Sequence, residues 1–129
     1  MSPEHTRHYS LEEASALLPR VGELLERMRA ARDRLGDAEA RAALAEAGQS
    51  NGGGEPGKVV SEGFLQLRRS MLELQEHGIV LRDLDRGLVD FPAVIDGREV
   101  YLCWLLDEPA VTHWHAIESG FAGRKPLAD

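Results

Sequence analysis

The chain has 129 residues, which suits one domain and leaves little room for a second. Charged residues make up 29% and hydrophobic residues 43%, a balance typical of a globular protein. With 15 Lys and Arg against 22 Asp and Glu, the formal net charge is −7. This charge argues against nucleic acid and anionic membranes as partners, because both bind basic surfaces.

The ends and the cysteine content exclude further classes. The sequence contains no apolar run long enough to span a membrane. Residues 1–9 lack the apolar segment of a signal peptide, so we expect a flexible N-terminus and a cytoplasmic location. Cys103 is the single cysteine, which excludes an intramolecular disulfide and any cysteine-only zinc site within one chain.

Residues 10–47 predict one long helix, since Leu, Ala, Glu and Arg dominate there. Ser10 and Glu13 have the spacing of a capping box. Pro19 removes one backbone donor, but the apolar pattern continues past it. Apolar residues recur in steps of three and four, the pattern of a helix that packs along one seam: Ala14, Leu17, Val21, Leu24, Met28, Ala31 and Leu35.

A glycine-rich loop over residues 48–57 separates this helix from a second one over residues 58–77, with Gly78 as its stop signal. Two such helices would pack antiparallel as a long, coiled-coil-like hairpin. The first helix would be longer than the second, so its alanine-rich residues 38–47 would lack a partner helix. We therefore expect a homo-oligomer, most simply a homodimer, formed through the helices.

From residue 79 the apolar period changes to two, which predicts short strands. The strongest candidate is Val100–Leu106, and Asp96-Gly97 before it is a hairpin turn signal. Three short strands would form an antiparallel meander within residues 79–127. The predicted fold is therefore α+β, a single domain over residues 10–127 with the helical hairpin packed on a small sheet.

Ligand-type side chains gather among apolar neighbours in this last third. Asp90 lies within a predicted strand, Glu108 follows the strongest strand, and His113 and His115 come soon after. In an extended segment His113 and His115 would point to the same face, where two imidazoles can share a cation. With a carboxylate they would suit a divalent transition metal, namely iron(II), manganese or zinc.

Other interpretations of the same residues stay open. One histidine could be exposed while the other hydrogen-bonds a carboxylate in a purely structural pair. Glu108 or Asp90 could act with His115 as a general acid and base. A heme could bind through His115, with Trp104, Trp114 and Phe121 as pocket walls. Cys103 lies in the middle of an apolar strand, which favours an inert core thiol.

Three more residues could support such a site. Arg124 could bind an anionic ligand, although an ion pair with Asp90 or Glu118 is the simpler role. Trp104 and Trp114 are most simply core or subunit-interface residues, and stacking on an aromatic ligand is the alternative.

The residues described so far resemble the small bacterial proteins grouped as domain of unknown function 2203, over residues 8–127. The resemblance implies signature positions at Asp90, Trp104, Glu108, Trp114, His115, Gly120, Phe121 and Arg124, and it implies no function. His113 is not among these positions. The segments that carry the resemblance are Ser10–Ala14, Leu17–Pro19, Gly87–Pro92, Cys103-Trp104, Glu108, Trp114-His115 and Gly120–Arg124.

The leading hypothesis is a cytoplasmic binding protein with a carboxylate–histidine metal site built from Asp90, Glu108, His113 and His115. Two alternatives remain: a helical interaction module without a ligand, and a small acid/base enzyme that uses Glu108 and His115.

Overall fold

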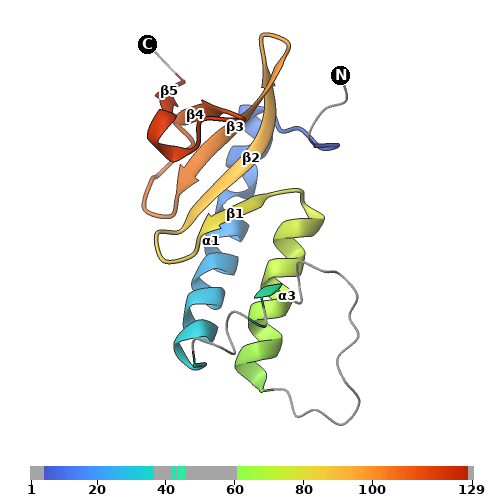
Figure 1. Cartoon of the computed structure of the whole chain (residues 1–129), viewed down its shortest axis with the longest axis vertical. Helices are drawn as coiled ribbons and strands as arrows, with labels where there is room; N and C mark the ends of the chain where they lie inside the picture. Colours follow the sequence, from blue (N-terminus) through green and yellow to red (C-terminus); the bar gives the residue numbers. More distant parts are fainter. Residues whose placement is uncertain (1–4, 37–41, 43, 46–60, 128–129) are drawn as a thin grey trace.

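The computed structural model describes residues 5–36, 42, 44–45 and 61–127, and there it places two helices against a five-stranded sheet (Figure 1). Helix α1 (Leu11–Asp33) and helix α3 (Glu62–Glu76) pack on each other. The predicted α+β class is correct. The strands are β1 (Val80–Asp83), β2 (Leu88–Ile95), β3 (Arg98–Leu105), β4 (His113–Ala116) and β5 (Lys125–Pro126).

Helix α1 begins with the predicted capping box. The Glu13 amide donates to Ser10 Oγ at 3.1 Å, and the Ser10 amide donates to Glu13 Oε1 at 2.8 Å. Pro19 lies inside the helix without ending it. The apolar seam is the buried face of the helix and consists of Ala14, Val21, Leu24, Leu25, Met28 and Ala31.

The prediction of one helix over residues 10–47, and with it the long helical hairpin, is wrong. Helix α1 ends at Asp33 after 23 residues, and neither Leu35 nor Gly36 is helical. Glycine inside a helix costs about 1 kcal/mol relative to alanine, because it loses more backbone freedom. Gly36 was not recognised as a stop signal, because the apolar repeat continues to Leu35. Helix α3 has only 15 residues.

Helix α3 starts later than the predicted residue 58, which itself lies outside the described residues, as does the predicted loop at 48–57. Its N-cap is Ser61, whose hydroxyl accepts from the Phe64 amide at 3.2 Å. Gly78 follows the helix with a φ of 73°, as the stop signal predicted. A Cβ on Gly63 would lie 3.3 Å from the Ala31 carbonyl, so glycine lets α3 approach α1 closely here.

The sheet is an antiparallel meander in the order β1-β2-β3-β4-β5. The hairpin turn between β2 and β3 is confirmed at Asp96 and Gly97, whose φ angles are 52° and 78°. Only three strands were predicted. Strands β4 and β5 were missed because they have four and two residues, too few for an alternating pattern to be recognised.

The two faces of the sheet differ in chemistry because successive residues of a strand point to opposite sides. One face joins the core formed with the helices and includes Val89, Phe91, Leu102 and Trp104. The register pairs Asp90 with Cys103 and Tyr101 with His115, so these side chains share the opposite face. That face carries the polar residues.

Residues 5–9, for which no functional role was predicted, contact the sheet. The Tyr9 amide donates to the Pro92 carbonyl at 2.7 Å, and the Tyr9 ring is buried against Phe91. The His8 ring lies 2.7 Å from Glu99 through Nε2 and Oε2. This segment therefore covers part of β2 and β3.

Candidate metal centre

Asp90 on β2 and His115 on β4 are two of the most buried polar side chains that the structure describes, with 1% and 2% of their surface exposed. His115 Nε2 lies 2.9 Å from Asp90 Oδ2. Burying such groups is costly unless they are paired or bind a ligand, so their contact needs a physical account.

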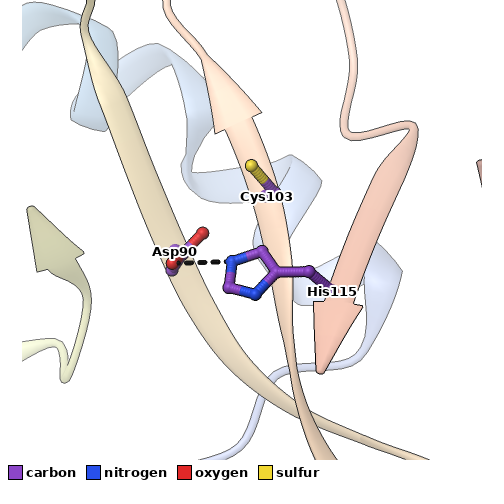
Figure 2. Close-up of side chains that lie close together, drawn as sticks. All are labelled: Asp90, Cys103 and His115. Atoms are coloured by element: carbon purple, nitrogen blue, oxygen red, sulfur yellow. Dashed lines mark hydrogen bonds and ion pairs between the residues drawn. The ribbon is translucent and has the colours of Figure 1, made fainter. Parts of the chain in front are cut away.

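Cys103 lies on β3, the strand between β2 and β4, and is fully buried (Figure 2). The register places Cys103 directly opposite Asp90 and one diagonal position from His115. One ligand atom from each of the three side chains lies within 4.8 Å of the other two. Three neighbouring strands thus bring a carboxylate, a thiol and an imidazole to one point.

The hydrogen bonds of His115 define which nitrogen carries a proton. His115 Nδ1 lies 2.8 Å from the Ala116 carbonyl oxygen, which can only accept, so Nδ1 must be protonated. In a neutral ring Nε2 would then hold a lone pair facing the Asp90 carboxylate, and the two would repel each other. A proton or a metal ion must therefore lie between Nε2 and Oδ2.

Asp90 uses one carboxylate oxygen for both of its contacts. Oδ2 faces His115 and also accepts from Arg82 Nε at 2.8 Å. Oδ1 is buried and has no hydrogen-bond partner among the described residues. An unsatisfied buried acceptor costs about 1–3 kcal/mol, so this oxygen is available to a ligand.

The charges around Asp90 affect its neighbours. Burial raises the pKa of the Cys103 thiol to about 12, and the negative charge of Asp90 adds to the increase. Burial alone would lower the pKa of Arg82, but the hydrogen bond and charge of Asp90 raise it overall. Without a cation, Cys103 is therefore a neutral thiol and Arg82 balances the charge of Asp90.

A cavity of about 400 Å³ borders Asp90, Cys103 and His115. Arg82 and Phe121 line it as well, together with residues 117–120 of the loop after β4. A volume of this size suits a small molecule. The three side chains therefore lie at the wall of a site that a ligand can enter.

The structure brings together two of the four predicted metal ligands, Asp90 and His115. Glu108 is used elsewhere: its Oε1 accepts from the Leu105 amide at 2.9 Å, and its Oε2 accepts from Arg124 at 2.6 Å. His113 is partly exposed and contacts the Thr112 hydroxyl through Nδ1 at 2.9 Å. The extended geometry predicted for His113 and His115 is present in β4, but the two rings are not part of one cluster.

Three further residues have structural roles in the described part of the chain. Arg124 forms an ion pair, as the simpler interpretation held, but with Glu108 instead of Asp90 or Glu118. Trp104 is buried in the core, and its indole donates to the Glu108 carbonyl at 2.9 Å. Trp114 packs against the core, on the other face of β4 from His115, so the two tryptophans do not form walls around that imidazole.

Two residues at this site, Cys103 and Arg82, were not among the predicted site residues. Cys103 was interpreted as an inert thiol, and Arg82 was not singled out. Alternation along β3 placed Cys103 on the same face as Tyr101, yet the pairing with Asp90 depends on the strand register. Arg82 lies next to a register shift in β1, which a sequence pattern does not reveal.

The profile of a protein family described as "Uncharacterized conserved protein (DUF2203)" matches residues 7–127. The chain belongs to the DUF2203 family. No curated protein and no solved structure matches it. The resemblance seen in the sequence is thus confirmed, and the function of this DUF2203 protein has to be inferred from its cluster.

Proposed function

We propose that this DUF2203 protein is a small metal-binding protein in which Asp90, Cys103 and His115 hold one divalent transition metal ion, with zinc as the preferred ion. The observation that carries the proposal is the convergence of three buried ligand-type side chains, one of which has an oxygen without a partner.

The chemistry of the three side chains fits such an ion. Ligand atoms around tetrahedral zinc lie about 3.5 Å apart, because the bonds measure about 2.0–2.3 Å. One ligand atom of each side chain lies within 4.8 Å of the other two, so small side-chain movements would close the site. Asp90 Oδ1, Cys103 Sγ and His115 Nε2 would be the ligand atoms. The thiolate favours zinc or iron(II) over manganese.

Neighbouring groups would support these ligands. A metal-bound histidine usually donates its other N–H to a carbonyl or carboxylate, and His115 does so to Ala116. Arg82 donates to the second oxygen of Asp90, which would hold the carboxylate in place. Uptake of the ion must displace the Cys103 proton, so metal binding would release protons.

Three protein ligands leave one position of a tetrahedral ion open, and the cavity lies beside it. A metal ion in such a position supplies a Lewis acid or lowers the pKa of a bound water. The three side chains would bind the ion, and Phe121 would line the cavity beside it.

The test is metal analysis and zinc titration of protein purified without a histidine tag. We expect one zinc per chain and a rise in melting temperature on zinc addition. Cys103→Ser and His115→Gln should abolish the rise, while His113→Gln, on the same strand and outside the cluster, should retain it.

A different result would favour the interaction module without a ligand. In that case zinc, iron(II) and manganese would leave the melting temperature unchanged, and metal content would stay far below one per chain. His115→Ala would still lower the melting temperature, because it would leave Asp90 buried without its partner.

A further inference from the structure

We infer that the cavity beside the metal position binds a small oxyanion, such as an organic carboxylate or a phosphate, held jointly by the metal ion and Arg82. This inference rests on the proposed function and names the class of ligand that the same site would take.

Arg82 is placed for this role by two contacts. Its Nε donates to Asp90 Oδ2, and its guanidinium lies over the Tyr101 ring, 4.9 Å from the centroid. These contacts fix the guanidinium plane while 41% of the side chain stays exposed. Since Arg82 lines the cavity, its terminal N–H groups can reach a bound anion.

Charge balance favours a monoanion. A divalent ion with the Asp90 carboxylate and the Cys103 thiolate would have no net charge, which leaves the positive charge of Arg82 beside it. Glu118 also lines the cavity, but it is exposed at the rim, where water and salt screen it. Arg86, whose guanidinium carbon lies 4.3 Å from the centre of the Phe121 ring, is exposed as well and is not among the cavity-lining residues, so its charge is screened in the same way.

The outer wall limits the size and polarity of the ligand. The guanidinium carbons of Arg86 and Arg124 lie 4.3 and 5.0 Å from the centroid of the Phe121 ring. Arg124 is neutralised by Glu108 and therefore holds the ring without attracting the anion strongly. Leu88 and Ile117 add apolar surface. A cavity of about 400 Å³ with this lining suits a small organic anion.

The experiment uses the full chain loaded with cobalt(II), whose visible absorption reports thiolate ligation and the fourth ligand. Acetate and inorganic phosphate are titrated separately as the two probes. We expect at least one of them to change the spectrum at saturation without removing the cobalt. Acetate binding would identify a carboxylate as the ligand, and phosphate binding a phosphate.

Variants connect the effect to Arg82. Arg82→Gln should weaken anion binding at least about tenfold, the effect of losing one charge-assisted hydrogen bond. Arg82→Lys should restore part of it, since the charge remains. Arg69→Gln, an exposed residue on α3 with the same change of charge, should bind like the wild type.

The outcomes separate the two proposals. If cobalt gives no thiolate absorption, the proposed metal site is wrong, and the oxyanion inference that depends on it is wrong as well. If the cobalt spectrum forms but neither anion changes it, or if Arg82→Gln binds as tightly as the wild type, only the oxyanion inference is overturned.

Discussion

His115 shows most directly how one residue can hold either a proton or a metal ion. Its Nδ1–H donates to Ala116, and its Nε2 faces Asp90 at 2.9 Å. Nδ1 should therefore carry a proton in both the metal-free and the zinc-bound protein, and Nε2 should become a zinc ligand when the ion binds. Nitrogen-15 NMR of the imidazole measures this change. A metal-free ring protonated at Nε2 alone would contradict the assignment of Nδ1 as the donor.

Asp90 should matter for stability even without a metal. Removing Asp90 leaves His115 Nε2 and Arg82 Nε without their hydrogen-bond partner, which costs about 1–3 kcal/mol. We therefore expect Asp90→Ala to lower the free energy of unfolding by an amount in that range, as measured by urea denaturation. Asp107→Ala, which removes an exposed carboxylate, is the control and should change stability by less than about 0.5 kcal/mol. Equal stabilities of the two variants would refute the role of Asp90.

Asp90 could be identified because an ionisable residue within an apolar strand is unusual and usually has a partner, and His115 because it lies two residues from His113 and close to carboxylates in the sequence. The sequence could not select among the carboxylates. Glu108 had an equally suitable position, but its carboxylate caps the end of β3 and pairs with Arg124. That difference depends on where the loop after β3 turns, which the spacing of residues does not determine.

At the scale of an element, Gly87 in the turn between β1 and β2 should tolerate no side chain. Its φ is 67°, and a Cβ there would lie 2.6 Å from Leu106 Cβ. Gly97 has a similar φ of 78° but has nothing within 4 Å of a Cβ, so it controls for backbone strain.

We expect Gly87→Ala to lower the free energy of unfolding by at least about 1 kcal/mol more than Gly97→Ala, because overpacking adds to the strain of a positive φ. Urea denaturation of both variants measures the difference. Equal losses would mean that the turn relaxes away from Leu106.

The helices show where periodicity was sufficient and where it was not. The capping box at Ser10 and the stop at Gly78 depend on local hydrogen bonds and backbone preference, and both were predicted correctly. The end of α1 at Asp33 was missed, because the apolar repeat continued and the intrinsic cost of Gly36 was not weighed. Short strands such as β4 take their conformation from neighbouring strands, so the pattern within the strand is too weak to define them.

At the scale of the whole molecule, the buried thiol should make stability depend on pH. The pKa of Cys103 is raised from an ordinary 9.0 to about 12. Between these two pH values the thiol of Cys103 keeps its proton in the folded state and has lost it in the unfolded state. The contribution of this thiol to the free energy of unfolding is complete below pH 9.0 and is lost as the pH rises toward 12.

Metal-free wild type should thus lose more stability than Cys103→Ala between pH 9.0 and about 12, as urea denaturation at several pH values would measure. Subtracting the free energy of unfolding of the variant at each pH removes the contribution of tyrosine and lysine titration. Parallel pH profiles would show that the thiol is not sheltered from water in the folded state.

The assembly and location stay predictions. The homo-oligomer was inferred from a helix longer than its partner, but α1 has 23 residues, and most of the alanine-rich stretch at 38–47 lies outside the described residues. Sedimentation equilibrium would determine the number of chains. Within the described residues, neither helix has both the length and the apolar character needed to cross a membrane.

The central claim is that Asp90, Cys103 and His115 bind one transition metal ion together, and X-ray absorption spectroscopy of the zinc-loaded protein tests it most directly. The account predicts one sulfur neighbour at about 2.3 Å with nitrogen or oxygen neighbours at about 2.0 Å. The sulfur neighbour should disappear in Cys103→Ser. A zinc spectrum without any sulfur neighbour in the wild type would contradict the account.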